Sequence, residues 1–356
     1  MSSGARRDPR STVGGAVRYP QPLRAGDTIG VTAPSAGVAD ALRPRLDFCV
    51  SHLRDLGYQV VVGDCMDGSG VTSAPASARA AELQEMLTDP GIGAVVPPWG
   101  GELAIDLLSL LDFQTLADAE PTWLVGYSDT STLLMPVTLL TGVATVHAPN
   151  LMDTPFRVPE PLAHWLDVVT AERGAQIEQG PAQRHQRDWP DFAADARVTE
   201  LNLDQPAGWK LLDPAAGSVQ ATGRLLGGCL ETVAMLPGTP YGNLPVFVAD
   251  HCPEGVLLYL EVAESSALVA ARLFHHVRLA GWLDAASAVL IGRTPGPDTA
   301  GFTQHDALLS AFGDLDVPVV YDVDVGHLPP QLALVNGALA TLSVDPQTQS
   351  LRQRLV

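Results

Sequence analysis

The sequence predicts an α/β protein with two domains, a parallel-sheet domain followed by a mixed α/β domain. The first observation is the length of 356 residues, which suffices for two domains of ordinary size. The second is an apolar content of 46%, enough for a substantial core. The third is an alternation of short apolar runs with stretches of helical periodicity, which is typical of a parallel sheet covered on both faces.

The N-terminal domain is predicted over residues 20–152, after a disordered tail at 1–19. Its pattern is Rossmann-like or flavodoxin-like, because each apolar strand is followed by a segment with helical spacing. The expected strands are 27–33, 58–62, 93–96 and 123–127, and the expected helices are 42–53, 74–87, 102–111 and 130–140.

Residues 153–219 are predicted to be a linker or insertion, since prolines punctuate the segment and its periodicity is weak. We expect a helix at 161–173 and a strand at 198–203 within it. The C-terminal domain is predicted over 220–356. Its expected strands are 246–249, 256–260, 288–291, 318–321 and 339–344, and its expected helices are 230–236, 269–280 and 304–312.

Composition and charge exclude several classes of function. The net charge is −19 and Lys210 is the sole lysine, so no basic stripe is available to bind nucleic acid. No apolar run reaches the ~20 residues of a membrane span, and the N-terminus lacks the apolar core of a secretory signal. The four cysteines are far apart, which disfavours disulfides and zinc sites. We therefore expect a cytoplasmic protein without a membrane partner.

Cofactor and metal sites are not expected. The first strand and loop lack the G-x-G-x-x-G pattern of a dinucleotide site. Asp322 and Asp324 lie near His327, but no further histidine or cysteine is spaced to complete a metal site.

The stretch 121–150 carries the main chemical signal. An apolar run, Trp123-Leu124-Val125, leads through Gly126-Tyr127 to Ser128 and then to a predicted helix. A serine between a buried strand and a helix start has the geometry of a nucleophile elbow, which exposes the hydroxyl next to free helix N–H groups. The alternative is that Ser128 or Thr130 only caps the helix.

A serine nucleophile needs a base, and the base needs a group that holds it. Glu261 directly follows a buried strand, where a surface role is hard to justify, and His327 lies in a loop after another strand. The carboxyl ends of parallel strands form the reactive edge of a sheet, so Ser128, Glu261 and His327 are the predicted triad. His147, which also follows a strand, is a second candidate base.

Backbone donors for an oxyanion are predicted at two places. One is the N–H of Asp129, which follows the serine. The others are the N–H groups of Gly100 and Gly101, because a Gly-Gly turn lets the backbone approach a substrate closely. The alternative is a simple turn.

An ordered set of motifs resembles the LD-carboxypeptidases, a family of serine peptidases that includes muramoyl-tetrapeptide carboxypeptidases and microcin C immunity proteins of the MccF type. The resemblance runs from about residue 27 to residue 342. The motifs are Gly26 to Ser35, Gly100-Gly101, Gly126-Tyr127-Ser128-Asp129, Gly223 to Gly228, Leu260-Glu261, Arg278 to Gly281, and Gly326 to Pro329.

The resemblance implies a Ser–Glu–His triad on Ser128, Glu261 and His327, with oxyanion donors at Gly101 and Asp129. It also implies an active site between the two domains, no metal or other cofactor, and usually a homodimer. Cys229 stands where the family usually has asparagine, so the substrate preference is expected to differ.

The form Trp99-Gly100-Gly101-Glu102, the long segment 151–217 and the Gly208-Trp209 pair look more like the MccF branch. That branch hydrolyses amides linking an aminoacyl or peptidyl group to a nucleotide. Trp99 and Trp209 are the candidate substrate contacts, and Trp209 is predicted either to stack on a base or to pack at the domain junction.

Two alternatives stay open at this stage. One is a muramoyl-tetrapeptide LD-carboxypeptidase of cell-wall recycling. The other is a catalytically silent binding protein that keeps the fold.

Overall fold

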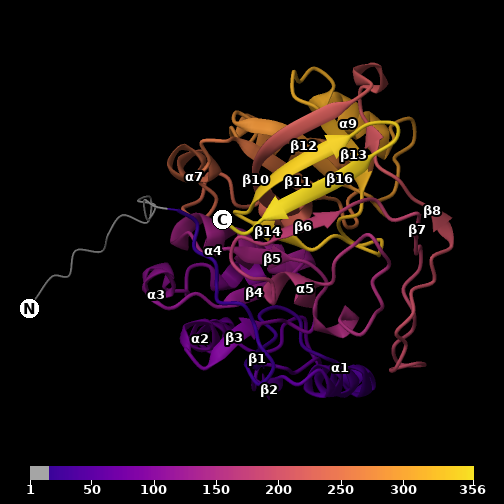
Figure 1. Ribbon diagram of the computed structural model, residues 1–356. Helices are drawn as coiled ribbons and strands as arrows, with labels where there is room; N and C mark the ends of the chain where they lie inside the picture. Colours follow the sequence, from indigo (N-terminus) through magenta and orange to yellow (C-terminus); the bar gives the residue numbers. More distant parts are fainter. Residues whose placement is uncertain (1–15) are drawn as a thin grey trace, which may run out of the picture.

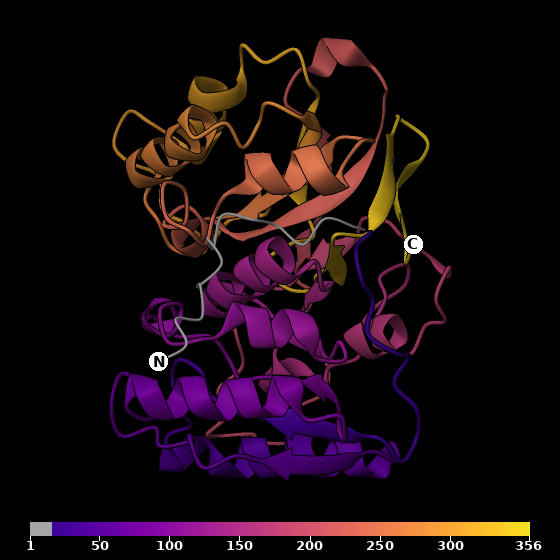
Figure 2. The same ribbon diagram turned by 90° about the vertical axis from the view of Figure 1, so that its left-hand side faces the viewer.

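Two β-sheets, one built mainly from each half of the chain, organise the fold (Figure 1). The computed structural model describes residues 16–356, so most of the predicted tail at 1–19 lies outside the described residues. The halves form two lobes, one above the other in Figure 2. The predicted two-domain α/β architecture is confirmed.

The first sheet has six strands in the order β14-β5-β4-β3-β1-β2. They are β1 (Thr28–Val31), β2 (Gln59–Val62), β3 (Ile92–Val95), β4 (Trp123–Gly126), β5 (Thr145–His147) and β14 (Leu334–Asn336). The five strands from the N-terminal half are parallel. The sixth, β14, comes from near the C-terminus and pairs antiparallel with β5, so the second half of the chain completes the sheet of the first.

Helices connect these parallel strands, since parallel neighbours need a crossover connection. They are α1 (Arg43–Asp55), α2 (Ala76–Thr88), α3 (Phe113–Asp118) and α4 (Ser131–Thr141). All four residues of β4 are buried, and so are ten of the eleven residues of α4. Helix α4 lies at the centre of the molecule, where it contacts both β5 and β10 of the second sheet (Figure 1).

The second sheet has eight strands in the order β6-β16-β15-β10-β11-β12-β13-β9. Its central strands β10 (Val219–Cys229), β11 (Val256–Glu261), β12 (Ala286–Gly292) and β13 (Val319–Val323) are parallel. The outer strands β15 (Leu339–Val344), β16 (Gln349–Arg354), β6 (Gln176–Gln179) and β9 (Lys210–Leu211) pair antiparallel. The associated helices are α6 (Leu230–Val233), α7 (Leu244–His251), α8 (Ala267–Leu279) and α9 (Gln304–Phe312).

The segment between the lobes is largely irregular. It contains the short helix α5 (Trp165–Val169), strand β6 and the two-residue strands β7 (Arg184–His185) and β8 (Gln205–Pro206). The helix expected at 161–173 is thus only five residues long. The strand expected at 198–203 is absent from the described residues, because side chains bind its backbone: Arg45 donates to Val198 O, and Gln186 accepts from the Asn202 N–H.

The strand predicted at 246–249 is wrong, because these residues lie in α7. Asn243 caps the helix by accepting a hydrogen bond from the Val246 N–H, and Pro245 occupies the first turn. These start signals outweigh the β-propensity of the valines. The helix expected at 102–111 is likewise reduced to a short 3-10 helix at Ala104–Leu107.

Within residues 16–356, no helix is both long enough and apolar enough to cross a membrane.

Candidate active site

Ser128 lies at a sharp turn between β4 and α4. Its φ is +61°, a left-handed conformation that costs a non-glycine residue free energy and is typical of strained functional positions. Gly126, two residues earlier, has a φ of +157°, and a Cβ there would lie 2.6 Å from Asn150 Oδ1. The same Oδ1 accepts a hydrogen bond from the Tyr127 N–H at 3.2 Å. The local structure therefore holds the serine in the geometry of a nucleophile elbow.

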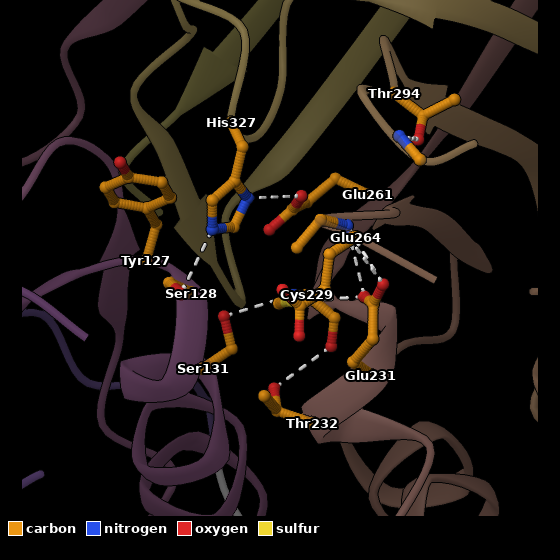
Figure 3. A network of polar contacts seen from close by, with 12 residues as sticks. Tyr127, Ser128, Ser131, Cys229, Glu231, Thr232, Glu261, Glu264, Thr294 and His327 are labelled. Carbon is orange, nitrogen blue, oxygen red and sulfur yellow. Dashed lines mark hydrogen bonds and ion pairs between the residues drawn. The ribbon is translucent and has the colours of Figure 1, made fainter. Parts of the chain in front are cut away.

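Two side chains from the second half of the chain meet this serine. Glu261 is the last residue of β11, and His327 lies in the loop between β13 and β14. His327 Nε2 is 3.1 Å from Ser128 Oγ, and His327 Nδ1 is 2.9 Å from Glu261 Oε2 (Figure 3). Both contacts are satisfied when Nδ1–H donates to the carboxylate and the serine O–H donates to Nε2. The structure thus brings together the three residues that the sequence predicted.

The ionisation of Glu261 and that of His327 are coupled. The Glu261 side chain is fully buried, and that of His327 is 22% exposed. Burial alone lowers the pKa of His327, but the charge and hydrogen bond of Glu261, with the charges of Glu231 and Asp153, raise it above its ordinary value. Burial alone raises the pKa of Glu261, but His327, His147 and Cys229 together lower it. The carboxylate therefore favours a protonated imidazole next to it.

The Gly-Gly turn lies directly against the serine. A Cβ on Gly100 would be 2.8 Å from Ser128 Cβ and 2.9 Å from its Oγ, so only glycine fits there. The buried Asp129 carboxylate accepts hydrogen bonds from Ser35 Oγ at 2.5 Å and from the Ala104 N–H at 2.8 Å, and the Ala36 N–H donates to Gly100 O at 3.2 Å. Gly101 has a φ of +141°, and over residues 16–356 neither its N–H nor that of Asp129 has a backbone acceptor.

A second polar network fixes the loop that follows Glu261. The Glu231 carboxylate accepts hydrogen bonds from the backbone N–H groups of Ala263, Glu264 and Ser265 at distances between 2.9 and 3.2 Å (Figure 3). The Cys229 thiol lies 3.4 Å from Glu231 Oε2. The sequence reasoning did not single out Glu231, although an acid two residues after the Gly-Gly-Cys motif was a signal for it.

The same network joins the two lobes. Ser131 Oγ, in the first turn of α4, accepts a hydrogen bond from the Cys229 N–H at 3.1 Å. A Cβ on Gly228 would lie 2.8 Å from Ser131 Cβ, so the end of β10 rests on the helix that follows the nucleophile. This close contact explains the second glycine of the Gly227-Gly228 pair.

The three tryptophans near the site differ in exposure. Trp209 is 4% exposed, and its indole N–H donates to Asp324 Oδ2 at 2.7 Å, so it packs in the interior and has no free face for a base. Trp99 is half-buried, with its N–H on Gly37 O at 3.0 Å. Trp189, which the sequence reasoning missed, is 37% exposed and donates to the backbone carbonyl of His327 at 3.2 Å.

A half-buried acid stands near the histidine. Burial raises the pKa of Asp153 to about 7, against the opposing charge of Arg45. Tyr127 O–H lies 3.5 Å from its Oδ2, and the Tyr127 ring lies 5.0 Å from the ring of His327. Asp153 could not be singled out from the sequence, because it lies in a segment without regular periodicity.

Comparisons with known proteins agree over most of the chain. Residues 29–148 match the model of the LD-carboxypeptidase N-terminal domain, and residues 222–342 match that of the LD-carboxypeptidase C-terminal domain. A putative carboxypeptidase of Vibrio cholerae is 27% identical over 95% of this chain and 98% of its own length. The microcin C7 self-immunity protein MccF of Escherichia coli is 25% identical over 94% and 95%.

A further relative is a probable murein peptide carboxypeptidase of Bacillus subtilis, 23% identical over 92% of each chain. Among solved structures, MccF in an inactive mutant apo state superposes with a TM-score of 0.78 at 24% identity, covering 94% of this chain and 98% of its own. MccF in complex with aspartyl sulfamoyl adenosine superposes with a TM-score of 0.77 at 23% identity and the same coverage. These structures share the fold of this chain.

Proposed function

The chain belongs to the LD-carboxypeptidase family of peptidases, and from this premise we propose that it is a serine peptidase whose catalytic triad is Ser128, His327 and Glu261. One observation carries the proposal: a continuous hydrogen-bond chain runs from the serine hydroxyl through the imidazole to a fully buried carboxylate. A strained serine at a strand-to-helix turn, next to an imidazole, is what acyl transfer requires.

In the first half of the reaction, Ser128 Oγ attacks the scissile carbonyl while His327 Nε2 takes its proton. Glu261 keeps Nδ1 protonated, so that Nε2 is free to accept, and stabilises the imidazolium that forms. His327 then gives the proton to the leaving amine. In the second half, His327 activates a water that hydrolyses the acyl-enzyme at Ser128.

The negative charge on the carbonyl oxygen would be stabilised by backbone donors. We assign this role to the N–H groups of Asp129, which follows Ser128, and of Gly101, which follows the Gly100 that lies against Ser128. Neither has a competing backbone acceptor within the described residues. Each such donor contributes about 3 kcal/mol to the stabilisation of the transition state. The Asp129 carboxylate binds Ser35 Oγ and the Ala104 N–H, and so acts only by holding the segments on either side of the Gly-Gly turn.

The mechanism needs no metal, since the base and the oxyanion donors are both supplied by the protein. Activity should therefore survive prolonged dialysis against EDTA. A loss of activity that added Zn²⁺ or Mg²⁺ restores would contradict this part of the proposal.

For the substrate, we favour an amide that links an aminoacyl or peptidyl group to a nucleotide. The relatives of the MccF type support this, since MccF binds aspartyl sulfamoyl adenosine. On this chain, the exposed ring of Trp189 next to His327 offers a surface on which a flat base can stack. For Trp209 the sequence left two readings, stacking on a base or packing at the domain junction, and its burial at 4% exposure favours packing. Trp99 stays a candidate contact.

A second candidate is a carboxypeptidase acting on murein tetrapeptides, favoured by the Bacillus subtilis relative. Incubation of the protein with a murein tetrapeptide and with an aminoacyl sulfamoyl nucleoside, followed by mass spectrometry of the products, separates the two. Release of the terminal amino acid from the tetrapeptide alone would favour the murein role.

The serine itself is tested by Ser128→Ala and by a fluorophosphonate probe. The variant should lose several orders of magnitude in turnover with its folding intact, and the probe should label wild type but not the variant. Wild type that binds ligand but is neither labelled nor active would instead identify a silent binding protein.

The family resemblance also leads us to propose a homodimer in the cytoplasm. Light scattering after gel filtration measures the first, and cell fractionation measures the second.

A further inference from the structure

A second histidine, His147, lies next to the proposed triad. His147 is the last residue of β5 and is fully buried. In the sheet it pairs with Gly126 of β4, two residues before Ser128, and with Leu334 of β14. Strand β5 therefore lies between the strand that leads to the nucleophile and the strand that follows the His327 loop (Figure 1).

Aromatic contacts place His147 next to Glu261. Its ring lies 5.3 Å from the ring of Tyr259, edge to face. Tyr259 and Glu261 are two residues apart on β11, so both side chains project from the same face of the sheet. On another side, the ring of Tyr127 lies 6.3 Å from His147 and 5.0 Å from His327. His147 thus occupies the space beside the Glu261–His327 pair.

The charge state of His147 suits a donor to a carboxylate. Burial lowers its pKa to about 4, against the opposing charge of Glu261 and with that of His327. The titratable groups that face it are these two and the hydroxyls of Tyr127 and Tyr259. At neutral pH the imidazole is neutral, so it has one N–H donor and one acceptor.

Complementary polar atoms are left over in this space. Within residues 16–356, both ring nitrogens of His147 and the Oε1 of Glu261 are buried and have no N–H or O–H partner in the protein, and the Cys229 thiol beside the carboxylate is a weak donor. The other carboxylate oxygen, Oε2, binds His327. A buried ionised oxygen with no strong donor is costly, and buried polar groups of this kind are commonly joined by an ordered water.

This inference rests on the proposed function. We propose that His147 is a positioning residue for the triad. Its N–H donates through one bridging water to Oε1 of Glu261, and this keeps Oε2 turned toward His327. The histidine touches no substrate. It acts by holding the carboxylate in the rotamer that orients and stabilises the imidazole, as outer-shell partners hold the ligands of metal sites.

The effect is measurable on His327 itself. Without the donor, the carboxylate loses its fixed orientation and stabilises the imidazolium less, so the pKa of His327 falls. Loss of one charge-assisted hydrogen bond predicts a fall of about one pKa unit and a loss of about 10–100-fold in kcat, with little change in KM. If His147 only packs in the core, its replacement lowers the melting temperature and leaves the pKa of His327 unchanged.

The test compares His147→Leu, which removes the donor, with His147→Gln, which keeps an N–H. NMR titration of ¹⁵N-histidine-labelled protein measures the pKa of His327, assigned with His327→Gln. Val146→Ala, on the opposite face of β5, is the control for destabilisation. We expect the pKa to fall in H147L, to recover in H147Q and to stay at the wild-type value in V146A. If H147L does not fold, His147→Phe, which also lacks a side-chain donor, takes its place.

An unchanged pKa of His327 in H147L, or in H147F, overturns the proposal. A fall that H147Q fails to restore overturns it as well, because the N–H would not be the active element. The titration needs no substrate, so it reports on His147 even if the proposed peptidase activity is absent, whereas an inactive wild type with an unlabelled Ser128 would reject the proposed function alone.

Discussion

Replacement of Glu261 by glutamine tests the relay at its most buried point. The change removes one charge while keeping size and shape, and it leaves an amide 2.9 Å from His327 Nδ1. An amide that turns its NH₂ toward Nδ1 forces the proton onto Nε2, the nitrogen that must accept from Ser128. The expected defect is therefore chemical, in kcat, and binding of substrate should change little.

The magnitude follows from the geometry. Charge centres about 4 Å apart at an effective dielectric constant of about 20 interact by about 4 kcal/mol. This corresponds to a factor of about 10³ in rate. The tautomer effect acts in the same direction, so we expect kcat to fall by about 10³–10⁴-fold.

The assay follows release of the amino acid from an aminoacyl sulfamoyl nucleoside, or from a murein tetrapeptide if that is the substrate cleaved, across the pH range. Glu264→Gln is the matched control, since its carboxylate is exposed three residues away and its N–H, which binds Glu231, is kept. Thermal unfolding checks that both variants fold. Activity of Glu261→Gln within tenfold of wild type would refute the assignment of Glu261 to the relay.

Three further predictions follow from the site. The acid limb of kcat/KM should have its midpoint above about 6.5, because His327 must be neutral to accept the proton and its pKa is raised above that reference value; a rate that stays flat down to pH 4 would exclude His327 as the base. Gly100→Ala should abolish most activity, since the new methyl lies 2.9 Å from Ser128 Oγ, while unfolding measurements show a loss of about 1–3 kcal/mol; wild-type kcat would contradict the close contact. Trp189→Ala should raise KM for a nucleotide substrate about 10-fold with kcat nearly unchanged, whereas an equal KM in both proteins would remove the stacking role.

The sequence predicted the central parallel strands well, because they are buried on both faces and read as continuous apolar runs. Helix α9 and strand β15 begin and end at the predicted residues. The failures lie where periodicity does not decide the structure. In α7, capping by Asn243 outweighs the β-propensity of the valines. Strand β14 was not predicted, because it is only three residues long.

The sequence predicted those site residues that lie at the end of a strand. Ser128 and Glu261 directly follow or close apolar runs, so their place on the reactive edge could be read from the chain. Trp189, Asp153 and Glu231 could not be found in this way, since long-range contacts decide their positions: Trp189 binds the carbonyl of His327, and Glu231 binds backbone groups more than 30 residues away.

The loop that carries His327 starts in one sheet and ends in the other. Strand β13 before it belongs to the second sheet, and β14 after it pairs with β5 of the first. The loop that carries the imidazole therefore bridges the two lobes. The distance between His327 and Ser128 depends on how the lobes pack against each other. On the proposed mechanism, disruption of the short β14–β5 ladder would displace His327 from Ser128 and lower activity without any change to the triad residues.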